Sequence, residues 1–268
     1  MKFQKFLELS MTFPVNHQQL LSGNSMYSYL SQLSKINFVY WNSRNPYFSD
    51  TYLNSSMKAA LTLIKGEGYL SDFNPKRASD FVDCIENKIN SFQMDDPNFN
   101  ELSYIFDLIQ AWGGRMGKMP YIKKKSSASS TRDKFDDWKD IYLKGVTFAL
   151  NDSPVAALKQ WRMISGLGAS FSPKHLRFWT NKYPVLDSRI SLLLCGSKRL
   201  LNKPEGYQEF LELIEKLSIK FDTNILEMEK ALFAFSQNFY SNDTLKIKSK
   251  DLSDITDIHI AKKISFIN

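Results

Sequence analysis

The sequence predicts a mainly α-helical protein, and three features of the chain carry this prediction. Apolar residues recur with the spacing of a helix face, as in the stripe formed by Leu102, Ile105, Phe106 and Ile109. The pairs Ser153-Pro154 and Ser172-Pro173 each place an N-cap residue before a proline at the first helical position. A hydrophobic content of 43% and an aromatic content of 14% suffice for a packed core.

The expected elements follow one another along the chain. Apolar and polar residues alternate over 7–15, which predicts a short strand that ends at a proline. Helical stripes then occupy residues 57–64, 81–92, 102–109, 207–221 and 225–239. From residue 242 the chain alternates Lys, Asp and Ile, which favours either short strands or a docked extension. Strands are therefore expected only near the termini.

A basic segment rich in lysine and serine, residues 121–134, divides the chain. We expect a mainly helical N-terminal lobe over 1–120, a second helical lobe over 135–241 and a C-terminal extension over 242–268. The composition of the basic segment is that of a solvated loop. It acts either as a surface linker or as a loop that contacts phosphates through Lys123, Lys124 and Lys125.

Charge and composition limit the partners. The formal net charge is +7 and the pI is about 9.2, a balance that favours a polyanionic partner. Cys84 and Cys195 form no CxxC pattern and the histidines are isolated, so neither a metal site nor a disulfide scaffold is expected. The N-terminus lacks the apolar core of a signal peptide, and no apolar run is long enough to span a membrane. We expect a cytoplasmic protein with no cofactor and no membrane partner.

The stretch from Ile164 to Trp179 reads as a helix, a glycine hairpin and a second helix. Gly166 and Gly168 stand one residue apart, a spacing that allows a tight backbone turn. The helix after such a turn offers unpaired backbone N–H groups and a positive dipole end, which suit a DNA phosphate. The stretch therefore predicts a phosphate-binding helix-hairpin-helix.

Two side chains beside the hairpin are suited to cleaving the bond between a base and deoxyribose. Asp187 opens the next expected helix; such an acid is commonly only a cap, but a carboxylate also stabilises an oxocarbenium-like sugar. Lys174 follows the hairpin by one turn, and a partly desolvated lysine beside an acid can attack the sugar C1′ as a nucleophile. The resulting Schiff base permits strand scission by elimination.

These residues resemble the hairpin region of the helix-hairpin-helix DNA glycosylases, and more narrowly the bacterial proteins with an 8-oxoguanine DNA glycosylase fold. Two further segments, residues 111–118 with the sequence AWGGRMGK and residues 229–234 with the sequence EKALFA, resemble that narrower group. The resemblance spans about residues 100–240. It implies two helical lobes around a cleft, extrusion of a modified base from double-stranded DNA, and Asp187 as the catalytic carboxylate.

The resemblance leaves the nucleophile open. In the better-known glycosylases the lysine stands two residues after the second glycine, a position that Ser170 occupies here. Lys174, one helical turn later, lies closer to Asp187 in sequence than is usual. It is either the nucleophile or a phosphate-neutralising group. In the second case Asp187 would activate water and the enzyme would lack lyase activity.

The remaining candidates concern DNA contact and the base pocket. The expected DNA-contacting residues are Gly166, Gly168, Ser170, His175, Arg177, Arg115, Lys118, Lys123, Lys124 and Lys125. Trp112 either stacks on an extruded base or belongs to the core, and Phe235 is a second base-pocket candidate. Glu227 and Glu229 are expected on a solvated helix face.

The substrate and the class of function also stay open at this point. The expected substrate is an 8-oxoguanine-type lesion or a bulky modified cytosine of the kind found in phage DNA, such as glucosylated hydroxymethylcytosine. The alternative to a monomeric glycosylase is a non-catalytic DNA-binding module that uses the hairpin.

Overall fold

The computed structural model describes residues 27, 30–31, 34–48, 52–65, 73–113, 138–164 and 167–239. Over these ranges the regular structure is helical, with a single antiparallel bridge between Tyr52 and Arg77. The helices are α4 (Phe38–Asn42), α5 (Ser55–Lys65), α6 (Ala78–Ser91), α7 (Phe99–Trp112), α8 (Trp138–Leu150), α9 (Pro154–Trp161), α10 (Ser172–Thr180), α11 (Ser188–Cys195), α12 (Arg199–Asn202), α13 (Gly206–Lys220) and α14 (Ile225–Phe239). The predicted mainly α class is confirmed.

Several expectations fall on parts of the chain outside these ranges. They are the strand over 7–15, the basic loop over 121–134 and the C-terminal extension over 242–268. The same holds for Gly166, Arg115, Lys118, Lys123, Lys124 and Lys125, whose expected DNA contacts stay predictions.

Local signals in the sequence fix several helix ends. The Asn98 side chain accepts hydrogen bonds from the backbone N–H groups of Asn100 and Glu101 at the start of α7. Ser153 is the N-cap of α9 and Pro154 its first residue, as predicted, although the Ser153 hydroxyl donates to the carbonyl of Asn151. The stripe that predicted α7 is fully buried. Local capping and periodicity therefore place these helices correctly.

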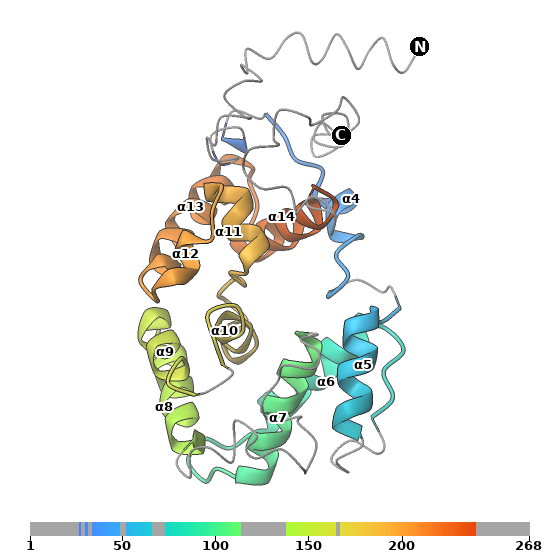
Figure 1. Cartoon of the computed structure of the whole chain (residues 1–268), viewed down its shortest axis with the longest axis vertical. Coiled ribbons are helices and arrows are strands. Elements are labelled where there is room, and N and C mark those ends of the chain that lie inside the picture. The colour runs from blue at the N-terminus through green and yellow to red at the C-terminus, as the bar shows by residue number, and fades with distance from the viewer. Residues whose placement is uncertain are drawn as a thin grey trace.

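Figure 1 shows α10 in the middle of the fold, between the helices that precede it and those that follow. α10 packs against α6, α7, α8 and α9, whereas α14 packs against α4, α11 and α13. One continuous hydrophobic core runs through both groups.

Packing crosses the predicted boundary at residue 120. α4, from the expected N-terminal lobe, packs on α14 near the other end of the described chain. The Trp41 ring meets the edge of Phe235 with ring centroids 5.3 Å apart. An N-terminal segment therefore belongs to the α11–α14 group, because α14 needs a partner for its apolar face.

Candidate active site

The hairpin before α10 is closed by its own backbone and by one hydroxyl. The N–H groups of Phe171 and Ser172 donate to the Gly168 carbonyl at 2.9 Å and 3.0 Å. The Ser172 hydroxyl donates to the carbonyls of Leu167 and Gly168 at 3.0 Å and 3.1 Å. The predicted N-cap role of Ser172 is thus wrong: Phe171 is the N-cap, and Ser172 is the first helical residue.

Gly168 has a free outer face. Its φ is not in the left-handed region, and a Cβ atom added there would meet nothing within 4 Å. The backbone conformation at Gly168 therefore does not require glycine, contrary to the sequence expectation for this position. Gly168 is exposed, and the space beyond its Cα atom is open. Ser170, two residues later, is half-buried.

Lys174 lies in the first turn of α10 and reaches back to the end of α7. Its Nζ donates to the Gly113 carbonyl at 3.2 Å and lies 4.4 Å from the centroid of the Phe171 ring. A Cβ atom on Gly113 would come within 2.8 Å of Phe171 Cε1 and 3.1 Å of Lys174 Nζ. Glycine at 113 therefore leaves room for the close approach of the Phe171 ring and, slightly farther away, of the Lys174 side chain.

Asp187 begins α11 as the sequence predicts. Its Oδ1 accepts from the N–H groups of Arg189 and Ile190, each at 2.9 Å. Burial raises the pKa of Asp187 above its usual value, while the Ile190 N–H and the Lys174 charge partly offset this rise. The result is a desolvated carboxyl that two backbone donors and a nearby cation hold in place.

Lys174 and Asp187 line the same small cavity. Its other walls are Tyr47, Phe48, Trp112, Val185, Glu229 and Phe233. The cavity volume is about 30 Å³, which is the space of roughly one water molecule. The structure thus brings a cation and a carboxyl together in an aromatic setting, and admission of anything as large as a base requires its walls to move.

Glu229 is the residue of this cavity that sequence reasoning missed. Its side chain is 2% exposed, so the expected solvated face is wrong for this residue. Burial raises the pKa of Glu229 to about 8; the Arg177 charge opposes this rise and the Asp187 charge adds to it. Glu229 falls on the apolar stripe of α14, four residues after Ile225 and three before Leu232. An acid on a core face was the available signal.

The two base-pocket candidates differ in placement. Trp112 lines the cavity, is 2% exposed, and donates through Nε1 to the Tyr47 carbonyl at 2.9 Å. It is therefore a core tryptophan that also forms a cavity wall. Phe235 does not line this cavity and packs on Trp41 instead, so its role in a base pocket stays a prediction without support from the cavity. Phe233, two residues earlier, lines the cavity instead.

His175 and Arg177 are buried, which contradicts their expected phosphate contacts. His175 is fully buried between the Tyr142 hydroxyl, 2.5 Å from Nδ1, and Gln110 Nε2, 3.2 Å from Nε2. Burial holds its pKa well below the usual value, so the ring is neutral. Arg177 is 5% exposed, bonds to Asn181 and lies 5.6 Å from the Phe48 ring centroid. α10 is enclosed by other helices, so few of its side chains reach solvent.

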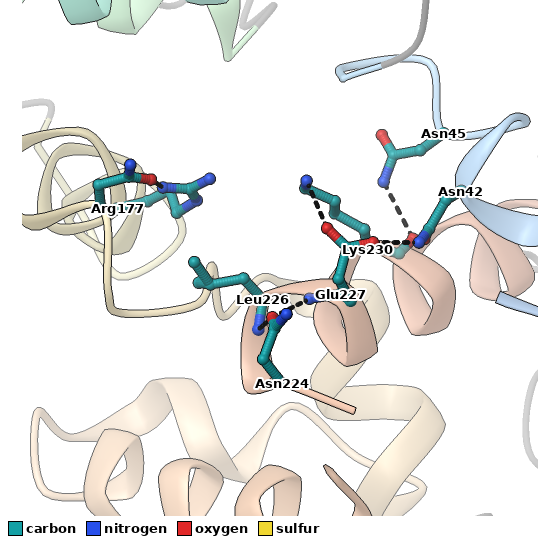
Figure 2. A network of polar contacts seen from close by, with 8 residues as sticks. Asn42, Asn45, Arg177, Asn224, Leu226, Glu227 and Lys230 are labelled. Carbon is teal, nitrogen blue, oxygen red and sulfur yellow. Dashed lines mark hydrogen bonds and ion pairs between the residues drawn. The ribbon is translucent and has the colours of Figure 1, made fainter. Parts of the chain in front are cut away.

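α14 supplies Glu229 and Phe233 to the cavity lining, and these two residues are called the α14 wall. A polar network joins this part of α14 to the segment after α4 (Figure 2). Lys230 pairs with Glu227 at 2.9 Å, and Glu227 accepts from Asn42 at the end of α4. Asn45 donates to the Lys230 carbonyl at 3.0 Å. This network fixes the segment that carries Tyr47 and Phe48 against α14.

The described residues contain no group of three or more His, Cys, Asp or Glu side chains placed to hold a metal ion. None of the helices in the described ranges is long and apolar enough to cross a membrane. Comparison of the chain with protein-family models, with characterised proteins and with solved structures finds no match. The residues of the cavity are therefore the basis for assigning a function.

Proposed function

We propose that this protein is a DNA glycosylase of the helix-hairpin-helix type, which extrudes a modified base from double-stranded DNA and cleaves its N-glycosidic bond. The observation that carries the proposal is that Lys174 and Asp187 line one aromatic cavity. Both residue types have the chemistry that this reaction needs, and the fold brings them together. Lys174 also caps the carbonyl at the end of α7, and the same side chain places its Nζ in the wall of a cavity beside a desolvated carboxyl.

The geometry suits a reaction that develops positive charge on a sugar. The Asp187 carboxylate, held by the Arg189 and Ile190 N–H groups, would stabilise the oxocarbenium-like centre as the base departs with the glycosidic electron pair. Because its carboxylate is already ordered by the helix start, little reorganisation accompanies the reaction. Burial strengthens the interaction, since no bulk water screens it.

Lys174 has two possible parts in this reaction. As a nucleophile, its deprotonated Nζ would attack C1′, the base would leave and take up a proton, and ring opening would give a Schiff base that permits strand scission. As a charged group, it would instead neutralise a phosphate while Asp187 activates water. The Gly113 carbonyl and the ring of Phe171 hold Nζ in the cavity wall. This inward position favours the first role, because a phosphate would meet a lysine at the surface.

DNA would approach from the hairpin side. The open space over Gly168 admits a phosphate close to the backbone, and the net charge of +7 favours a polyanion. A base that leaves the duplex would have to displace cavity walls, since the present volume fits one water. The aromatic walls Tyr47, Phe48 and Trp112 are then the surfaces on which the base would stack.

The test is base release from DNAs of different modification, identified by mass spectrometry. Genomic DNA from ordinary bacteria, DNA with 8-oxoguanine and phage DNA with glucosylated hydroxymethylcytosine would each be incubated with the protein. The proposal predicts release of one modified base by the wild type and none by Asp187→Asn. Release that is unchanged in Asp187→Asn would remove this cavity from the reaction.

The rival function is a DNA-binding module without catalysis, and the small volume of the cavity favours it. Such a module would bind duplexes in a salt-dependent way and release no base from any of these DNAs. If the protein does release a base, the DNA that loses it distinguishes two biological roles. Loss from DNA with 8-oxoguanine indicates repair, and loss from phage DNA with modified cytosines indicates defence.

A further inference from the structure

Glu229 is a buried acid in the cavity wall that the proposed reaction does not use. It comes from α14 and lines the cavity with Lys174 and Asp187. Its Oε2 atom is buried and has no hydrogen-bond partner among the described residues. A buried polar atom without a partner is uncommon and costly, so its retention needs an explanation.

The surroundings of the two carboxyls differ. Asp187 has two backbone N–H donors at a helix start and the charge of Lys174 nearby. Glu229 receives a single backbone hydrogen bond, from Val185. Two carboxyls that line one small cavity do not both ionise readily, and the proton goes to the one with fewer donors.

Besides Asp187, the charged and titratable groups near Glu229 include Arg177 on α10, Tyr207 on α13 and Lys230 on α14. Arg177 and Lys230 favour its ionised form, whereas Asp187 and burial oppose it, and burial is the largest effect. The Tyr207 hydroxyl on α13 is occupied as a donor to the Pro184 carbonyl at 2.6 Å. Together these effects favour the neutral form of the Glu229 carboxyl, whose O–H then lies in the wall of the cavity without a partner among the described residues.

We propose that Glu229 recognises the base that enters the cavity, its Oε2–H donating to an acceptor atom of the base while its other oxygen accepts from the adjacent N–H. This inference depends on the proposed function, because it names the residue that selects the substrate of the same site. The matching edge carries an acceptor next to an N–H, as in the ring nitrogen and amino group of a cytosine or the C8 carbonyl and N7–H of 8-oxoguanine, an edge that guanine lacks. An edge with two adjacent N–H donors, as on guanine, matches a carboxylate instead.

The experiment compares wild type with Glu229→Ala, Glu229→Gln and a matched control, Glu215→Gln, on exposed α13 surface. Duplexes with one 8-oxoguanine or one glucosylated hydroxymethylcytosine are the probes, with the unmodified duplex as reference. Excision rate and affinity are measured between pH 6 and pH 9.5. Circular dichroism confirms that each variant is folded.

Glu229→Ala is expected to lower excision and affinity for the preferred duplex about tenfold to a hundredfold, and Glu229→Gln to recover most of that loss. Because the amide does not titrate, the ratio of wild-type to Glu229→Gln activity is expected to fall as the pH rises through about 8. The duplex that shows the Glu229→Ala loss identifies which of the two edges is bound.

The failures are distinguishable. Excision that is equal in wild type and Glu229→Ala overturns the role of Glu229 and leaves the glycosylase proposal standing. A ratio that does not change with pH overturns the neutral carboxyl. If no duplex loses a base but affinity for a modified duplex still depends on Glu229, the glycosylase proposal fails and base recognition by Glu229 is supported.

Discussion

The two walls of the cavity are built in different ways. The backbone of the hairpin wall, with Lys174 and Asp187, is fixed by local contacts: a turn closed on the Gly168 carbonyl and a helix start capped by Asp187, with one distant contact from Lys174 Nζ to the Gly113 carbonyl. The α14 wall, with Glu229 and Phe233, is fixed by contacts between distant segments, among them the bond from Asn45 to the Lys230 carbonyl. The first wall carries charge with nearby partners and the second carries a buried acid with almost none. Local order thus positions Asp187 and the start of α10, whereas tertiary packing positions Glu229 and Phe233.

The largest effect is expected from removing the charge on the hairpin wall. Asparagine is as good an N-cap as aspartate, so Asp187→Asn keeps the start of α11 while it removes the carboxylate. We expect base release to fall by about 10²- to 10³-fold with a small change in stability. Asp187→Ala is the contrasting variant, because it also loses the cap and about 1 kcal/mol of stability. A thermal melt beside a release assay separates the two losses.

Lys174 is expected to give the next largest effect. Lys174→Arg keeps a positive charge but provides no usable nucleophile, whereas Lys174→Gln removes both. If Lys174 is the nucleophile, both variants lose strand scission completely, and Lys216→Gln on exposed α13 surface does not. Denaturing gels of a labelled duplex measure scission. Full activity of Lys174→Arg would show that only the charge matters.

Gly113, which lies against the Lys174 side chain, and Gly168, in the hairpin before α10, give a matched comparison. An alanine Cβ at Gly113 would lie 2.8 Å from Phe171 Cε1, whereas one at Gly168 would meet nothing within 4 Å. We expect Gly113→Ala to displace Lys174, lower excision about tenfold and cost about 1–3 kcal/mol of stability. Gly168→Ala is expected to leave stability nearly unchanged and to weaken DNA binding by crowding the hairpin. Equal urea midpoints for the two variants would contradict the close approach at Gly113.

The last prediction concerns stability alone and tests the α14 wall. Because burial raises the pKa of Glu229 from 4.5 to about 8, the folded protein binds a proton that the unfolded chain releases between these values. Stability should therefore fall as the pH rises through this window, by at most about 1.4 kcal/mol per pH unit from this group. Glu229→Gln should flatten that slope. Urea unfolding at several pH values measures it, and parallel curves for wild type and variant would contradict a neutral Glu229.

The sequence predicts local features of the hairpin wall, such as the start of α11, but not which side chains of α10 and α14 are buried. Capping and helical spacing are local, so the start of α11 at Asp187 and the stripe of α7 could be inferred directly. The burial of His175 and Arg177 could not, because it results from helices that enclose α10 on several sides. Glu229 looked solvated beside Glu227 and Lys230, yet Glu227 pairs with α4 and Glu229 faces the core. Which polar residue on a helix is buried depends on its distant partners.

The central claim is that Lys174 and Asp187 act together on a sugar in this cavity. The protein is incubated with borohydride and a duplex that contains the modified base it releases. Reduction would trap a Schiff base, and peptide mapping would locate it. Our account predicts a covalent protein–DNA adduct at Lys174, absent from Lys174→Gln and strongly reduced in Asp187→Asn. An adduct at another residue, or the same yield of adduct in Asp187→Asn, would contradict it.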